Sequence, residues 1–308
     1  APYASAQGII TSGLTGVVRD TSGKPIAGAA VTATHTPTGT AYSAATGENG
    51  RYNFRGLISG GPYTVAVSGA SLKATERTNL TTQLGSDVEV NFAVTPSAGD
   101  IVSLEKFTVK GESNELDSAA TGAGSLLNAA RLAAKPTTQR SFADVISASP
   151  FVTLRSMSSA NDREEAHLTA LGQNNRYNAF YVDGAINNDV FGLSASGTNG
   201  GQAAIAPLSI DAIDQFQVVI SPFDASLGNF TGGGINATTK GGTNTTSGTV
   251  YNFTQNQDLT GKTPTGLKSA ATKLNPFSAK TTGASVGGAI IKNKLFFFVN
   301  YESIESNR

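Results

Sequence analysis

The fold-deciding stretch of the chain runs from Ile210 to Gly248 and reads IDAIDQFQVVISPFDASLGNFTGGGINATTKGGTNTTSG. Gln215–Ile220 alternates weakly and ends in three consecutive β-branched residues, so it predicts a β-strand. In the glycine triplet at 232–234 the backbone can turn or approach another segment closely, because no side chain blocks it. Ile235–Thr239 then resumes strand character. The stretch contains no nucleophile motif, metal-ligand cluster or phosphate-binding loop.

The order of these features resembles the second half of the plug domain of TonB-dependent outer-membrane transporters. In that family a strand leads into a Gly-Pro turn, a Tyr-Gly-like step, a Gly-Gly pair, an Ile-Asn strand and a Thr-Lys-x-Gly exit into the barrel. The matching residues here are Ser221-Pro222, Leu227-Gly228, Gly233-Gly234, Ile235-Asn236 and Thr239–Asn244. Residues 230–237 are similar to the Oar-like subgroup in particular. The resemblance implies a plug signature made of Asp183, Gly184, Gly232, Gly233, Gly234, Ile235, Asn236 and Lys240.

The composition favours β-structure. The 308 residues include 35 Gly, no Cys and 14% charged residues, which is typical of turn-rich β-proteins rather than helical bundles. The formal net charge is zero and no basic run is present, so we expect no nucleic-acid partner. No apolar run approaches the roughly 20 residues of a spanning helix, whereas a barrel strand needs only about 10 alternating residues.

Residues 1–13 are interpreted as a leader or signal remnant. Ala4-Ser5-Ala6 has the small-x-small form of a signal-peptidase site, with Gln7 as the new terminus. The basic and apolar parts of a signal peptide are absent, so a plain small-residue tail remains an alternative.

Residues 14–96 predict a small β-sandwich. Short strands recur with turn signals between them, such as Asp20–Pro25 and Glu48-Asn49-Gly50. The runs 16–29 and 46–52 resemble carboxypeptidase regulatory-like domains. This resemblance implies an immunoglobulin-like fold without catalysis of its own.

Residues 97–114 are interpreted as a linker that carries one exposed strand. Phe107 and Val109 alternate with polar residues, and such a strand can add to the edge of a partner's sheet. By position it resembles a TonB box, so the candidate TonB-binding residues are Lys106, Phe107, Thr108, Val109 and Lys110. The alternatives are a plain linker or a last strand of the sandwich.

Residues 115–245 predict an α+β plug domain. We expect a short helix over Ser125–Ala134 and a second one from Ser141 to Pro150. Strands are predicted at 151–155, 167–170 and 180–184, the last ending in an Asp-Gly hairpin signal. Asn174–Tyr177 and Asn187–Gly201 are candidate ligand-facing loops, and the residues singled out in them are Asn174, Asn175, Arg176, Tyr177, Asn187, Asn188 and Asp189.

Residues 246–308 predict the first strands of a transmembrane β-barrel together with an extracellular loop. Ser285–Ile291 and Leu295–Glu302 flank a tight Lys-Asn-Lys turn, and alternate residues of the second strand are aromatic or aliphatic. The alternative is a two-sided core of a soluble sandwich. About three strands cannot close a barrel of the about 22 strands that the resemblance implies. We therefore expect the chain to be the front part of a longer protein.

No enzymatic chemistry is predicted. His35 and His167 lie in different domains and lack ligand-like spacing, so neither is expected to hold a metal. Glu164-Glu165 is interpreted as a solvated loop or a plug-wall ion pair. Neither a triad signature nor a phosphate loop is present, and we expect no cofactor. The hypothesis of a peptidase that carries a regulatory domain is rejected, because this sequence lacks a set of metal ligands.

The sequence thus predicts the N-terminal part of a TonB-dependent transporter in the outer membrane of a Gram-negative bacterium. The sandwich and linker would be periplasmic, and the plug would fill the barrel lumen. The implied partners are TonB with its ExbB/ExbD energising complex, outer-membrane lipid, and an imported siderophore, oligosaccharide, peptide or protein, with a surface lipoprotein as an optional further partner. The alternative function is a secreted or surface β-rich adhesin or structural protein without transport.

Overall fold

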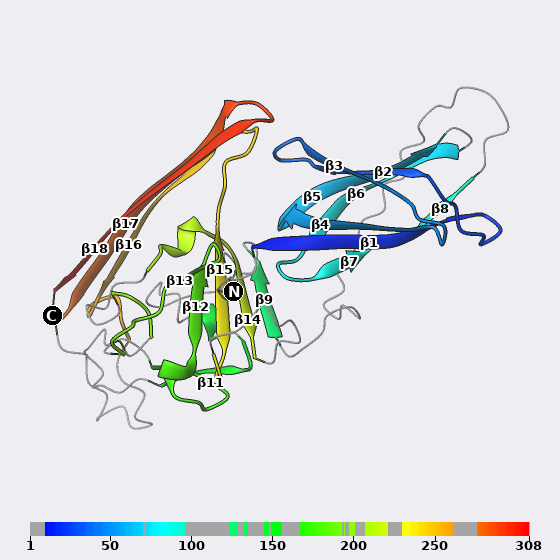
Figure 1. The fold of residues 1–308 in the computed structure, drawn as a ribbon. Coiled ribbons are helices and arrows are strands. Elements are labelled where there is room, and N and C mark those ends of the chain that lie inside the picture. Colours follow the sequence, from blue (N-terminus) through cyan, green and yellow to red (C-terminus); the bar gives the residue numbers. More distant parts are fainter. Residues whose placement is uncertain are drawn as a thin grey trace, which may run out of the picture.

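The computed structural model describes residues 10–69, 72–95, 124–128, 132, 134, 145–147, 149–155, 167–192, 194, 197–200, 207–220, 230–261 and 276–307. These residues are mainly β and form three units in chain order (Figure 1). We name them the sandwich (β1–β8), the central domain (β9–β15) and the C-terminal sheet (β16–β18). Among the described residues, no helix is long and apolar enough to cross a membrane.

The sandwich consists of two facing sheets, as predicted. One has the order β4-β1-β7, with β8 also paired to β1, and the other has the order β3-β2-β5-β6. The strands are β1 (Thr11–Asp20), β2 (Ala30–His35), β3 (Thr40–Ala45), β4 (Arg51–Ile58), β5 (Gly60–Gly69), β6 (Leu72–Thr82), β7 (Asp87–Glu89) and β8 (Phe92–Val94). β1 begins before the predicted start at Leu14, and its pairing with β4 already holds Thr11 opposite Ile58.

The sandwich core forms because alternate residues of each strand face inward. Val31, Ala33, Val65 and Val67 are fully buried on paired strands β2 and β5. The hydroxyl of Tyr52 donates a hydrogen bond to the backbone oxygen of Val90, which satisfies the one polar atom of a buried ring.

The central domain is built on a five-stranded sheet of order β13-β12-β15-β14-β9. Its strands are β9 (Gly124–Asn128), β12 (Ala179–Val182), β13 (Ala185–Ile186), β14 (Ile213–Val219) and β15 (Gly234–Thr239). β15 runs parallel to β12 and antiparallel to β14. A separate hairpin joins β10 (Val152–Arg155) to β11 (His167–Ala170), and two 3-10 helices lie at η1 (Asn175–Tyr177) and η3 (Ile210–Ala212).

The expected helix over Ser125–Ala134 is wrong at its start. Gly124–Asn128 is instead the edge strand β9, paired antiparallel with β14 so that Leu127 lies opposite Phe216. Leu127 joins the buried core, and this tertiary burial outweighs a local helix preference. Leu132 and Ala134 are helical, as are Val145 and Ile146 within the second predicted helix.

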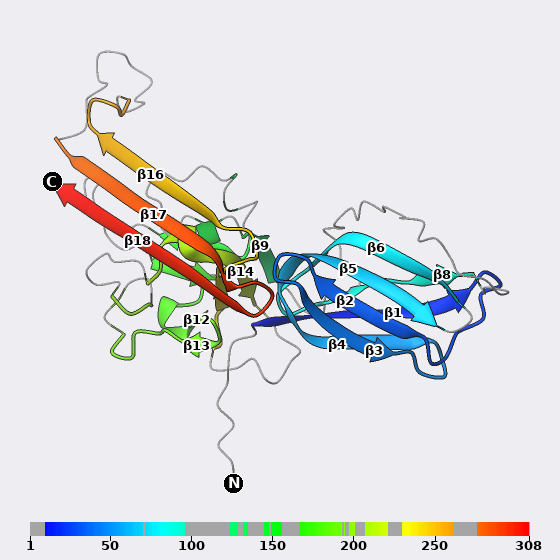
Figure 2. The same cartoon turned by 90° about the horizontal axis from the view of Figure 1, so that it is seen from above.

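The C-terminal sheet contains three long antiparallel strands in the order β16-β17-β18 and is open rather than closed. They are β16 (Ser247–Asn256), β17 (Ser278–Ile291) and β18 (Leu295–Asn307). The predicted Lys-Asn-Lys turn is confirmed between β17 and β18, with Asn293 at φ 63°. β17 begins well before the predicted start at Ser285. The sheet stands beside the central domain in Figure 1 and, viewed from above, extends across it (Figure 2).

Candidate functional site

Two loops of the central domain enclose a small cavity. The first contains η1, whose N-cap Asn174 accepts a hydrogen bond from the backbone nitrogen of Arg176 at 3.0 Å. The second follows β13 and starts at Asn187. The cavity between them has a volume of about 230 Å³. It is lined by Asn175, Arg176, Asn178, Asn188, Asp189, Val190, Phe191, Gly192, Ser194 and Gly197.

Asn178 fixes the first loop to the sheet. Its amide nitrogen donates to the backbone oxygen of Leu168 on β11 at 2.8 Å, and its amide oxygen accepts from the nitrogen of Gly233 at 3.0 Å. The side chain is 8% exposed. One buried amide thus joins η1, the β10–β11 hairpin and the glycine triplet.

Asn188 and Asp189 shape the second loop. The side-chain oxygen of Asn188 accepts from the nitrogen of Phe180 at 2.7 Å, and its amide donates to the oxygen of Asn178 at 3.2 Å. The carboxylate of Asp189 accepts from the nitrogens of Phe191 at 3.0 Å and Ser194 at 2.6 Å. These bonds bend the loop back over η1.

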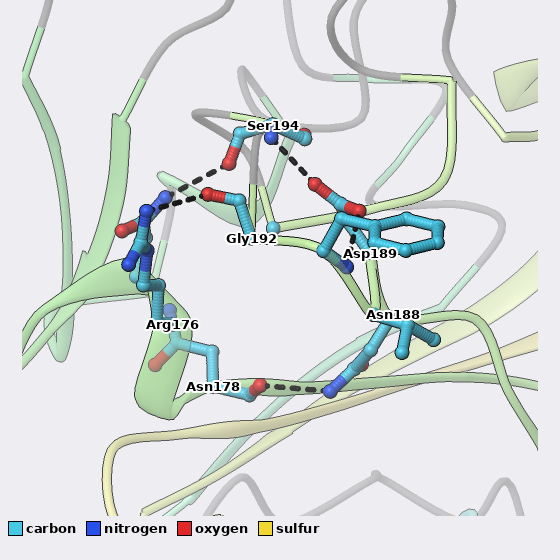
Figure 3. A pocket seen from close by; sticks show the side chains of 10 residues that line it. Arg176, Asn178, Asn188, Asp189, Gly192 and Ser194 are labelled. Carbon is cyan, nitrogen blue, oxygen red and sulfur yellow. Dashed lines mark hydrogen bonds between the residues drawn. The ribbon is translucent and has the colours of Figure 1, made fainter.

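Two side chains of the first loop close the cavity against the second (Figure 3). A guanidinium nitrogen of Arg176 donates to the oxygen of Gly192 at 2.8 Å, and the amide of Asn175 donates to the oxygen of Ser194 at 3.1 Å. Val190 and Phe191 are 88% and 83% exposed at the rim. The cavity therefore presents a cation, a carboxylate, several amides and two exposed apolar side chains, which are groups that can contact a ligand.

The structure brings most of the predicted ligand-facing residues together. Asn175, Arg176, Asn188 and Asp189 line the cavity, and Asn174 caps η1 beside it. Tyr177 is exposed, and Asn187 accepts a hydrogen bond from the amide of Asn199 at 3.0 Å.

Sequence reasoning did not select Asn178, whereas Val190, Phe191, Gly192 and Ser194 lie within the predicted loop Asn187–Gly201. Asn178 directly follows the predicted loop Asn174–Tyr177, and this position is the only sequence signal for its role.

The glycine triplet packs where side chains have no room. A Cβ added at Gly232 would lie 2.5 Å from the amide oxygen of Asn178, one at Gly233 would lie 2.7 Å from Cβ of Ala170, and one at Gly234 would lie 2.7 Å from the ring of Phe230. None of the three has a positive φ. Close approach, rather than a turn, therefore explains the triplet.

The remaining residues of the predicted plug signature lie on β15 and the turn beside it. Asp183 and Gly184 form the β12–β13 turn, both with positive φ, and the carboxylate of Asp183 accepts from the nitrogen and hydroxyl of Thr239, both at 2.8 Å. Ile235 is in the core, Asn236 is buried, and the nitrogen of Lys240 donates to the oxygen of Ala212 at 2.8 Å.

A polar contact joins the central domain to the C-terminal sheet. Ser209, the N-cap of η3, donates to the carboxylate of Glu302 on β18 at 3.0 Å, and the hydroxyl of Tyr251 on β16 donates to the same oxygen at 2.7 Å. Glu302 thus lies on the face of the sheet that is turned towards the central domain.

The candidate TonB-binding residues 106–110 lie outside the described residues, as do the rest of the predicted linker, Glu164-Glu165 and residues 1–9. His35 is buried in the sandwich, where its ring nitrogen Nδ1 lies 2.7 Å from the hydroxyl of Thr38. No group of three or more His, Asp or Glu side chains suited to a metal ion occurs within the part of the chain that the structure describes.

Comparison with known families identifies both ends of the chain. Residues 13–95 match the family model described as a carboxypeptidase regulatory-like domain, and residues 238–308 match the outer membrane beta barrel domain. The chain therefore combines a regulatory-like sandwich with part of an outer-membrane barrel domain. Over 97% of its length it is 27% identical to the TonB-dependent transporter Oar of Myxococcus xanthus. The chain spans 27% of the length of that relative.

Solved structures with partial similarity include the siderophore receptor PirA of Acinetobacter baumannii, at 20% identity and a TM-score of 0.43, covering 59% of this chain and 24% of that one. Another is catechol 1,2-dioxygenase of Acinetobacter sp. ADP1, at 14% identity and a TM-score of 0.24, covering 33% of this chain and 59% of that one. Both likenesses are too distant to support a functional argument.

Proposed function

We propose that the chain is the N-terminal part of a TonB-dependent outer-membrane transporter that takes up a ligand across the outer membrane. The observation that carries the proposal is the two-sided character of the C-terminal sheet. The exposed side chains of Val250, Val286, Val299 and Tyr301 share one face by register, while Glu302 on the opposite face is bonded to the central domain. The face of Glu302 also carries Phe253 and Ile304, so it mixes polar and apolar side chains, whereas the exposed apolar face is typical of the lipid-facing side of a membrane barrel.

In this proposal the central domain is the plug. The bonds from Tyr251 and Ser209 to Glu302 hold it against the first strands of the wall. The sandwich and linker lie in the periplasm. The match to the outer membrane beta barrel domain and the similarity to a TonB-dependent transporter support an outer-membrane location.

The cavity formed by Arg176 and Asp189 would be the plug's contribution to the ligand site. Its rim offers hydrogen-bond donors and two exposed apolar side chains, Val190 and Phe191, on loops fixed from below by Asn178. A siderophore, oligosaccharide, peptide or protein segment would be gripped there together with barrel loops. TonB, driven by ExbB/ExbD, would add to residues 106–110 as a strand and remodel the plug.

Binding to the periplasmic domain of TonB from the same organism tests this function. Val109→Pro removes one backbone donor needed for strand addition, whereas the matched Val109→Ala keeps that donor. We expect the wild type and Val109→Ala to bind with micromolar affinity and Val109→Pro to lose binding, as measured by calorimetry on the full-length protein in detergent. If none of the three proteins binds, a surface β-rich protein without transport becomes the better explanation.

A further inference from the structure

One end of the sandwich is clasped by the central domain. The turn between β6 and β7 is closed by a hydrogen bond from the nitrogen of Ser86 to the oxygen of Gln83 at 3.2 Å, which leaves Leu84 and Gly85 at its tip. The nitrogen of Leu84 donates to the side-chain oxygen of Gln215 at 3.3 Å, and the amide of Gln217 donates to the oxygen of Leu84 at 3.0 Å. The side chains of Gln215 and Gln217 thus bind the backbone nitrogen and oxygen of Leu84.

The geometry of β14 explains why two glutamines are available. A register shift between Ile213 and Gln215 lets Ile213, Phe216 and Val218 all face the core. Gln215 and Gln217 consequently point from the opposite face of the strand towards the sandwich. Gln215 is 3% exposed and Leu84 is 1% exposed, so the contact is closed to solvent.

Glycines bring the two units this close. A Cβ added at Gly85 would lie 2.7 Å from the side-chain nitrogen of Gln217, and one added at Gly60 would lie 3.3 Å from that of Gln215. Both glycines also have positive φ. Two turns of the sandwich therefore fit against one strand of the central domain.

The sandwich has a second attachment, at the turn of the C-terminal sheet. The nitrogen of Asn244 donates to the oxygen of Pro37, in the β2–β3 turn, at 2.7 Å. Asn244 and Asn293 are themselves joined by two hydrogen bonds of 2.7 and 2.9 Å. In both views the β2–β3 connection approaches the β17–β18 turn (Figures 1 and 2).

We propose that the sandwich is a two-point brace that holds the central domain in register with the first barrel hairpin. One point is the Leu84 clasp on β14, and the other is the contact of Pro37 and Gly39 with the Asn244–Asn293 pair. Hydrogen bonds are present at both points, and the first also buries the side chain of Leu84. The contacts of the brace do not depend on the proposed function, but its role does. That role is to hold the plug in place until TonB pulls on the chain.

The two points are coupled because the sandwich moves as one packed body. Its core joins both sheets, so β2 and the β6–β7 turn cannot shift independently. Loosening the Leu84 clasp should therefore weaken the contact between Gly39 and Asn293, although the hydrogen bonds of Gln215 and Gln217 go to Leu84.

Disulfide trapping in the full-length protein tests the brace. These 308 residues contain no cysteine, and a Cβ at Gly39 would lie 3.4 Å from Cβ of Asn293, close to the about 3.5–4.5 Å found in disulfides. Gly39→Cys with Asn293→Cys should cross-link on mild oxidation and shift on a non-reducing gel. The matched control is Gly28→Cys with Asn293→Cys, because Gly28 has nearly the same φ, 71° against 70°, and no atom within 4 Å of its added Cβ.

Coupling is measured by adding Gln215→Ala and Gln217→Ala to the trapping pair. We expect the cross-linking rate to fall at least fivefold, whereas Gln173→Ala, in an exposed turn, should leave it unchanged. Equal cross-linking of the Gly39 and Gly28 pairs, or a rate unaffected by the glutamine changes, would overturn the brace. This gel measurement needs no TonB. A chain that cross-links but does not bind TonB would therefore contradict the proposed transport function and still support the brace.

Discussion

Single buried amides carry much of the organisation of the central domain. Asn178 satisfies the oxygen of Leu168 and the nitrogen of Gly233 at once, and no apolar residue of similar size could do so. Its removal would leave two buried backbone groups without partners.

We expect Asn178→Ala to destabilise the central domain by about 2–4 kcal/mol, since each buried unsatisfied group costs about 1–3 kcal/mol. The free energy of unfolding of the full-length protein in urea, followed by limited proteolysis of the central domain, measures the loss. Asn174→Ala, which removes only an exposed cap, should cost about 1 kcal/mol or less. Equal losses for the two variants would contradict the role assigned to Asn178.

Asp214 should make stability depend on pH at the clasped strand. Burial raises the pKa of its carboxyl group, and the charge of Lys240 lowers it only in part. A raised folded pKa means that the folded state binds more protons, so stability is lost as the pH rises from the ordinary value of 3.8 through the folded pKa.

Asp214→Asn should therefore raise the melting temperature at pH 7. The gain should disappear below about pH 3.8, where the carboxyl group is protonated in both states. Thermal unfolding of both proteins between pH 3 and pH 8 measures it. A gain that persists unchanged at the acid end would show that charge burial is not its cause.

At the scale of elements, the C-terminal sheet separates two environments across one strand. Val299 is 57% exposed on the outer face of β18, and its neighbour Asn300 lies on the inner face opposite Ser285. Substitutions at Val299 and Asn300 therefore probe the two faces of the same sheet.

We expect Val299→Arg to destabilise the membrane-inserted protein by about 2–4 kcal/mol, as charged residues do on the lipid face near the bilayer midplane. Asn300→Arg, which faces the lumen in our proposal, should cost clearly less. Heat-modified mobility of outer-membrane fractions on gels measures the folded share of each variant. A larger loss for Asn300→Arg would reverse the assignment of the faces.

Element prediction from the sequence succeeded where a local signal was strong. The Asp183-Gly184 turn and the alternation around Val299 each correspond to an observed hairpin, because turn chemistry and period-two patterns act locally. The helix expected at Ser125 failed because a short Leu-Leu pair fits either structure, and only pairing with β14 decides between them.

At the scale of the whole molecule, the cavity was predicted only in part and the brace not at all. The polar loops around Arg176 and Asp189 were visible as turn-rich runs, but their convergence depends on the long-range bonds of Asn178. The brace is held largely through backbone atoms of Leu84 and Pro37, and such contacts cannot be predicted from the identity of these residues.

The use of sandwich backbone atoms at both contacts has an evolutionary consequence. The sandwich supplies main-chain atoms at both contacts, while its neighbours supply the side chains of Gln215 and Gln217 and the backbone nitrogen of Asn244. The other residues of its turns can then change while Gly39, Gly60 and Gly85 are kept, since an added Cβ at each would crowd a side chain of the neighbouring unit. Sandwich domains from distant relatives should accordingly be exchangeable here if they keep these turn lengths and glycines and if the central domain keeps Gln215 and Gln217.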